Sequence, residues 1–151
     1  MIVPETEFGC RPLGGWPAWV GSAPYAGAAH PQSEGAPPLA RGANCQRYAY
    51  AVLSLFDRTL PPHRSSELWS DEKLRHVERH EAMTLDLVLF NRTDVAWGSH
   101  VAVIFGSRLL HLCSEVGTPA IWSWADFARR ERYSRVVGIV RVPEPIRRPA
   151  P

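Results

Sequence analysis

The spacing of apolar residues changes along this chain from that of a helix to that of strands, and this change limits the possible fold more than any other feature. After Asn44, a suitable N-cap, apolar side chains at Tyr48, Val52 and Leu55 recur at the three- and four-residue spacing of an amphipathic helix. A helix followed by consecutive strands predicts an α+β fold, in which the helix packs on a central antiparallel sheet. The expected strands are runs rich in apolar residues at 85–90, 101–105, 109–113 and 136–142.

Further local signals add detail to this prediction. Residues 66–81 are rich in charge and predict an exposed helix, and Ser123 followed by Asp126 predicts a capped helix that runs through residue 131. The pair at 106–107, Gly-Ser, predicts a tight hairpin between two of the strands.

Proline and glycine divide the chain into three parts. Residues 1–40 hold 7 of the 14 prolines and 6 of the 11 glycines, which is too many for a long helix or a central strand. The same segment carries aromatic residues such as Trp16 and Tyr25, which disordered segments rarely contain at this density. We therefore expect residues 1–40 to form an irregular arm packed on one domain at 41–142, and residues 143–151 to form a flexible tail.

Charge and cysteine content narrow the possible partners and location. With 17 Lys and Arg against 15 Asp and Glu, the net charge of +2 gives no support for a nucleic-acid partner, and the basic cluster at 129–132 predicts a solvated helix face. No apolar stretch approaches the roughly 20 residues that span a bilayer, so no membrane partner is expected. Three widely spaced cysteines and an N-terminus without the pattern of a signal peptide predict a cytoplasmic location.

Cys45 is the candidate nucleophile because it lies in the first turn of the predicted helix. Unpaired backbone N–H groups and the helix dipole at that position favour a thiolate and predict a lowered pKa for the thiol. His100 and His111 lie on the two arms of the predicted hairpin, which should bring their side chains together. His100 can then accept the thiol proton while His111 holds its ring in the productive tautomer. Cys45 alone could be a small buried residue, and either histidine alone a hydrogen-bonded core residue; the set of three favours catalysis.

Five short segments resemble the NlpC/p60 family of cysteine peptidases, in the order in which the family carries them. They are Asn-Cys-Gln-Arg-Tyr at 44–48, the Leu-Pro and Arg-Ser-Ser pattern at 60–66, and the strands at 85–90, 99–106 and 109–111. The resemblance covers roughly residues 40–142. It implies a papain-like fold that hydrolyses an amide bond in a small peptide, usually a cell-wall peptide, through a thioester acyl-enzyme. In that mechanism Cys45 attacks, His100 transfers the proton and His111 orients His100.

The same resemblance indicates residues that contact the substrate, to which Trp97 is added as an aromatic residue just ahead of Ser99 and His100, and it shows two departures from the family. The expected substrate-binding residues are Asn44, Gln46, Arg47, Ser65 and Trp97. The family has Asp in place of Asn44 and Ser-Gly in place of Gln46-Arg47. Because an amide cannot neutralise an ammonium group, these changes allow a peptide-like substrate other than the usual cell-wall peptide.

Three alternatives remain open at this point. An acyltransferase would use the same thiol but pass the acyl group to an amine or alcohol, and a binding module would keep the fold without catalysis. A zinc site is the third, either at His76 and His80, which are four residues apart, or at Cys113 together with the two candidate catalytic histidines. We expect no metal and no cofactor, and the sequence predicts no oligomeric state.

Overall fold

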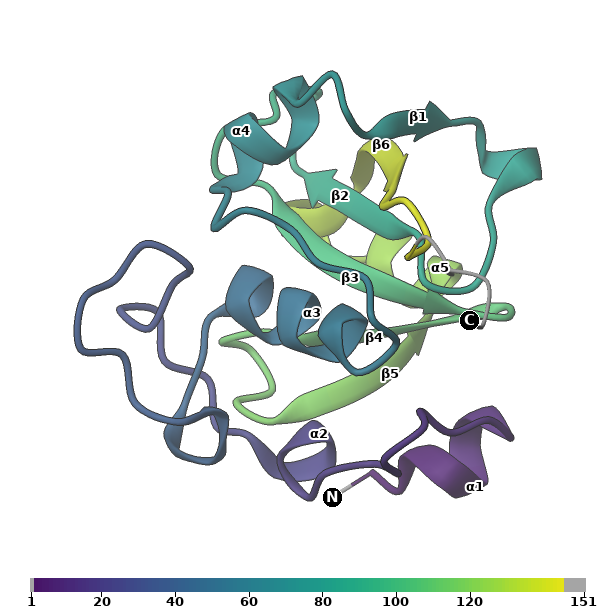
Figure 1. Cartoon of the computed structure of the whole chain (residues 1–151). Coiled ribbons are helices and arrows are strands. Elements are labelled where there is room, and N and C mark those ends of the chain that lie inside the picture. Colours follow the sequence, from purple (N-terminus) through teal and green to yellow (C-terminus); the bar gives the residue numbers. More distant parts are fainter. Residues whose placement is uncertain (1, 146–151) are drawn as a thin grey trace, which may run out of the picture.

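Residues 2–145 are described by a computed structural model, in which a six-stranded antiparallel sheet carries helices on both faces (Figure 1). The order of the strands across the sheet is β1-β6-β2-β3-β4-β5. The strands are β1 (Arg75–Val77), β2 (Leu87–Asn91), β3 (His100–Phe105), β4 (Arg108–Leu112), β5 (Pro119–Ser123) and β6 (Arg135–Arg141). The helices are α1 (Pro4–Phe8), α2 (Trp19–Ser22), α3 (Cys45–Ser54), α4 (Ser65–Ser70) and α5 (Trp124–Ala128), with 3-10 turns η1 (Leu39–Arg41), η2 (Arg79–Glu81) and η3 (Glu131–Tyr133).

Burial on both faces explains why the central strands are almost entirely apolar. In β3, Val101 and Val103 pack in the core that includes α3, whereas Ala102 and Ile104 pack in the core that includes Phe127 of α5. All six residues of β3 are buried. The predicted combination of helix and antiparallel sheet is confirmed, with α3 lying against β3 and β4.

The predicted hairpin joins β3 and β4. Phe105 pairs with Arg108 across Gly106 and Ser107, and Gly106 adopts a φ of 63°. A positive φ is costly for residues with a Cβ atom, so glycine suits this turn. The hairpin returns β4 along β3 toward the end of the sheet at which α3 begins.

The prediction of a helix over residues 66–81 is wrong beyond the first turns. Helix α4 ends at Ser70, and the chain then forms β1, which pairs with β6 at the edge of the sheet. Trp69 lies directly on the backbone of Gly138 in β6, where a Cβ atom would meet its ring at 2.1 Å, and the ring of His76 stacks on Trp69 at 3.8 Å. These contacts fix an edge strand that the charged sequence does not reveal.

Three further elements differ from the prediction by more than one residue. Strand β2 begins at Leu87 because Leu85 has a φ of 78° and the buried carboxylate of Asp86 pairs with Arg141 at 2.9 Å. Helix α5 has the predicted capping box of Ser123 and Asp126 but ends at Ala128, before the turn η3. Strand β5 has no counterpart among the predicted strands.

The segment before α3 packs on the sheet and on α3 at several points. The ring of Phe8 stacks on Phe105 with 4.2 Å between centroids, and the hydroxyl of Tyr48 donates to the carbonyl of Val20. At the other terminus, Glu144 pairs with Arg58 at 3.1 Å, whereas the rest of the predicted tail, 146–151, lies outside the described residues. Within residues 2–145, no helix has the length and apolar character needed to cross a membrane.

Candidate active site

Cys45 is the first residue of α3 and lines a cavity of about 500 Å³ at the end of the sheet. Asn44 caps the helix, since its side-chain oxygen accepts a hydrogen bond from the backbone N–H of Arg47 at 2.9 Å. The cap fixes the first turn and places Cys45 at the cavity, where the residue as a whole is of intermediate exposure. His100, the first residue of β3, lines the same cavity.

The environment of Cys45 favours the neutral thiol. Burial raises the pKa of Cys45, although backbone hydrogen bonds from Val101 and Gln46 and the positive charge of Arg132 act in the opposite direction. The predicted lowering of this pKa is therefore wrong, because the cost of removing the charge from water exceeds the effect of the helix N-terminus.

The two histidines meet across the hairpin. Nε2 of His100 lies 2.9 Å from Nδ1 of His111, and the two rings are close to perpendicular, at 83°. This contact leaves Nδ1 of His100 as the ring nitrogen available to a thiol or a substrate. Within residues 2–145 no hydrogen bond joins Cys45 to His100, and catalytic contacts of this kind often tighten only when substrate binds.

Both histidines are uncharged at neutral pH. Burial, and secondarily the charge of Arg132, lowers the pKa of His100 to about 3. Burial lowers the pKa of His111 well below its ordinary value, and the neighbouring His100 and Arg130 add to this effect. For His100 to accept a proton at Nδ1, its Nε2–H must donate to Nδ1 of His111, which places the proton of His111 on its own Nε2.

An aromatic enclosure holds His111 in place. Its ring lies 4.2 Å from that of Trp122 and 4.7 Å from that of Phe127, and the residue is fully buried. Nε2 of His111 has no hydrogen-bond partner among the described residues. His111 lies behind His100 rather than on the cavity surface, so any influence on a substrate passes through His100.

Four of the five predicted substrate-binding residues line the cavity. Asn44 and Gln46 flank Cys45, and Trp97 lies at the cavity with 76% of its surface exposed. Ser65, at the start of α4, accepts a hydrogen bond from the backbone N–H of Gly98 at 3.0 Å, which ties the wall of α4 to the loop before β3.

Arg47 does not line the cavity, so the structure corrects its assignment. Its guanidinium donates to the carbonyl of Gly42 at 3.1 Å. Two residues correspond to about 200° around a helix, so the side chain of Arg47 leaves α3 on the side away from Cys45.

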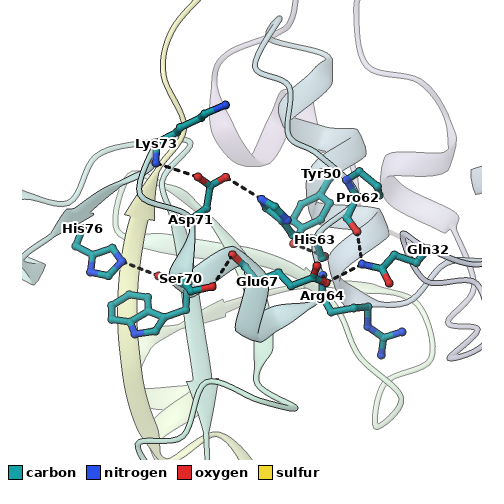
Figure 2. Close-up of polar contacts among 11 residues, drawn as sticks. Gln32, Tyr50, Pro62, His63, Arg64, Glu67, Ser70, Asp71, Lys73 and His76 are labelled. Atoms are coloured by element: carbon teal, nitrogen blue, oxygen red, sulfur yellow. Dashed lines mark hydrogen bonds and ion pairs between the residues drawn. The ribbon is translucent and has the colours of Figure 1, made fainter.

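A network of polar contacts holds the wall that carries Arg64 and Ser65 (Figure 2). His63 pairs with Asp71 at 2.8 Å and lowers the pKa of that carboxyl, while the hydroxyl of Tyr50 in α3 donates to the carbonyl of His63 at 2.9 Å. Glu67 accepts from the backbone N–H of Arg64 at 3.1 Å and from the side chain of Gln32 at 2.7 Å. The network therefore joins α3, α4 and the N-terminal segment beside the cavity.

The sequence did not indicate several residues that line the cavity. Tyr25 comes from the N-terminal segment, Arg64 and Glu67 from α4 and its cap, and Arg132 and Tyr133 from η3. The sequence predicts Arg132 on a solvated helix face with its neighbours, but the residue lies in the separate turn η3 after α5, which brings it to the cavity. Cys113, with Ser114, also contributes to the lining.

The zinc alternatives receive no support in the part of the chain that the structure describes. Residues 2–145 contain no group of three or more His, Cys, Asp or Glu side chains arranged to hold a metal ion. His76 is engaged by the carbonyl of Trp69 at 2.9 Å.

Comparison with known proteins gives a match at the level of structure. No protein-family model and no curated protein matches this sequence. The chain is similar to the solved structure of an NlpC/P60 family protein from Bacillus cereus ATCC 10987, with a TM-score of 0.53. The fold is NlpC/P60-like. The match has 17% sequence identity and covers 67% of this chain but 32% of the other, so the likeness is one of fold alone.

Proposed function

We propose that this protein is a cysteine hydrolase that cleaves an amide bond in a small peptide or peptide-like substrate. Cys45 is the nucleophile, His100 the general base and His111 the residue that positions His100. The observation that carries the proposal is the contact of 2.9 Å between Nε2 of His100 and Nδ1 of His111. His100 is the first residue of its strand and lines the same cavity as Cys45. The NlpC/P60-like fold adds support.

The proposed reaction has two halves. In the first, the thiol proton of Cys45 passes to Nδ1 of His100 while the sulfur attacks the amide carbonyl. The tetrahedral intermediate then collapses to a thioester as His100 returns the proton to the departing amine. In the second half, His100 takes a proton from water, the resulting hydroxide attacks the thioester, and the acid product leaves as the Cys45 thiol is restored.

The electrostatics favour proton transfer during the attack rather than before it. Because burial raises the pKa of Cys45 and lowers that of His100, a resting pair of thiolate and imidazolium is disfavoured. An imidazolium that forms transiently in this environment is a strong acid, which suits protonation of a leaving amine.

The size of the cavity supports a small substrate. A volume of about 500 Å³ lies within the range of about 300–1,000 Å³ that is typical of small-molecule sites. Trp97 is largely exposed beside the cavity and offers an apolar surface to part of the substrate.

The test is acylation of Cys45 by an activated ester, p-nitrophenyl acetate, followed by mass spectrometry of peptides. We expect Cys45 to gain an acetyl group faster than the exposed Cys10, and His100→Ala to slow this step about 100-fold, as loss of general acid–base catalysis does. Equal acylation of Cys45 and Cys10, unaffected by His100→Ala, would contradict the proposal and favour a non-catalytic binding module.

A second arm of the same experiment separates hydrolysis from acyl transfer. Decay of the acetyl-enzyme is followed with and without an added amine such as glycinamide. Release of acetate at the same rate in both cases supports hydrolysis, whereas faster decay with formation of the acetylated amine would identify an acyltransferase.

A further inference from the structure

One ring nitrogen inside the aromatic enclosure has no conventional hydrogen-bond partner. Nδ1 of the fully buried His111 lies 2.9 Å from Nε2 of His100, but Nε2 of His111 has no partner in the part of the chain that the structure describes. His111 does not line the cavity, so a substrate bound there does not reach this atom. Because a buried polar atom without a partner destabilises the fold, the surrounding rings must account for it.

The ring of Trp122 lies against that of His111. The two centroids are 4.2 Å apart and the planes meet at 65°, an edge-to-face geometry in which the edge of one ring meets the face of the other. Phe127 is farther from His111, at 4.7 Å, and its plane is less steeply inclined, at 53°. The face of an aromatic ring is negative, most of all in tryptophan, so it attracts an N–H hydrogen and repels a nitrogen lone pair.

Contacts nearer the surface restrict the orientation of the Trp122 ring. The guanidinium carbon of Arg130 lies 3.9 Å from the centre of that ring, and Nε of Arg130 lies 3.1 Å from both carboxylate oxygens of Glu115. The indole therefore contacts both the buried histidine and a surface ion pair. The charge of Arg130 adds to burial and to His100 in lowering the pKa of His111, which keeps that histidine neutral.

We infer that Trp122 is a positioning residue, whose ring accepts a hydrogen bond from Nε2–H of His111 and thereby fixes the tautomer of both histidines. With the proton of His111 on Nε2, its Nδ1 accepts from Nε2–H of His100, which leaves Nδ1 of His100 unprotonated. The opposite tautomer would place a lone pair of His111 against the indole and a proton on Nδ1 of His100, where a base needs a lone pair. The catalytic consequence rests on the proposed function, whereas the tautomer itself does not.

Nitrogen-15 NMR of the histidine side chains in the full chain tests the inference, because the shifts of the ring nitrogens report which one is protonated. The signals of His111 are identified by their absence in His111→Asn. We expect His111 of the wild type to be protonated at Nε2. We expect Trp122→Leu to lower the ratio of the Nε2–H to the Nδ1–H form about two- to fivefold, the effect of one weak hydrogen bond to an aromatic face. Acylation of Cys45 should fall with the fraction of the Nε2–H form.

Replacement of tryptophan by a ring-fluorinated analogue is a second test, which preserves the shape of the core. Fluorine withdraws negative charge from the face of the ring, so the tautomer ratio should shift in the same direction as in Trp122→Leu. The signal at His111 reports on Trp122, since this is the indole that contacts it. Phe127→Leu is the matched control, because it removes the other buried apolar ring beside His111, and its ratio should stay at the wild-type value.

The outcomes separate the role of Trp122 from the proposed function. An Nδ1–H form of His111 in the wild type, or a ratio that neither Trp122→Leu nor fluorination changes, would overturn that role, whether or not acylation depends on His100. An equal shift in Phe127→Leu would assign the tautomer to the packing of the core and would also overturn it. A ratio that shifts as expected, together with acylation that is independent of His100, would support the contact with Trp122 and overturn the proposed function.

Discussion

At the scale of single residues, the cavity is characterised by two neutral histidines that lie one behind the other with their rings nearly perpendicular. His111 is fully buried between Trp122 and Phe127, where a charge would be unfavourable, and it can therefore act on His100 only through a hydrogen bond. In the proposed reaction, this arrangement separates the residue that transfers the proton from the residue that positions it.

The roles that we propose for the two histidines predict unequal effects of substitution on the acylation of Cys45. His100→Ala should lower the acylation rate about 100-fold, and His111→Ala about 10-fold, because loss of an orienting contact leaves the base in place. His111→Asn, whose amide oxygen can still accept from His100, should recover part of the loss. Acylation rates of the three variants are compared by mass spectrometry, and a larger loss in His111→Ala than in His100→Ala would mean that the roles are exchanged.

Burial of the histidine pair also predicts that the free energy of unfolding depends on pH. The folded pKa of His100 is about 3 and that of His111 is also lowered, so below about pH 6.5 the unfolded chain binds protons that the folded chain does not. Stability is therefore fully present above that pH and decreases as the pH falls toward 3, by at most ~1.4 kcal/mol per pH unit for each histidine.

Urea unfolding between pH 7 and pH 5 measures this slope. The lowered carboxyl pKa values of Glu67, Asp71 and Asp126 act mainly at more acidic pH, and His30, whose pKa is also lowered, contributes equally to the slope of the wild type and of a variant at His111. His111→Asn should reduce the slope by up to ~1.4 kcal/mol per pH unit, and the same slope in both proteins would show that His111 is not buried in its neutral form.

The residues also show what a sequence can predict at this scale. The approach of His100 and His111 follows from a glycine turn and the pairing of two strands, which are local. The pKa of Cys45 could not be predicted, because it depends on how far the packed domain removes the thiol from water. The position of Arg132 could not be predicted either, because it depends on a turn that follows a helix ending earlier than expected.

At the scale of elements, the N-terminus of α3 and the wall formed by α4 determine the shape of the cavity. The helix, the hairpin and the antiparallel sheet follow from the periodicity and the capping residues. Strand β1 does not, because its pairing with β6 depends on Trp69 lying against Gly138, a contact between segments that are far apart in the sequence.

The cap of α3 gives a prediction that links an element to the site. Asn44→Ala should cost about 1 kcal/mol of stability and slow acylation of Cys45, because the first turn of α3 loses the bond to the backbone of Arg47. Ser123→Ala, which removes the equivalent cap of α5 on the other face of the sheet, should cost a similar amount and leave acylation unchanged. Urea unfolding and mass spectrometry measure the two effects; equal loss of acylation in both variants would indicate general destabilisation.

At the scale of the whole molecule, the N-terminal segment reaches both ends of the sheet. Tyr25 and Gly27 line the cavity, whereas α1 lies at the lower right of Figure 1, where Phe8 packs on Phe105 and Arg108 pairs with Glu7 at 2.7 Å. One segment therefore contributes both to the site and to a distant anchor.

Because the contacts of α1 lie away from the cavity, we expect that weakening them leaves the candidate active site intact. Phe8→Ala removes a half-buried ring from Phe105 and Trp16, and should lower the free energy of unfolding by about 1–2 kcal/mol. Acylation of Cys45 should remain at the wild-type rate, because Tyr48 and Trp19 still hold the part of the segment that approaches the cavity. Urea unfolding measures the first effect and mass spectrometry the second. A fall in acylation that matches the loss of stability would show that α1 and the cavity form one cooperative unit, with the N-terminal segment transmitting the change between them.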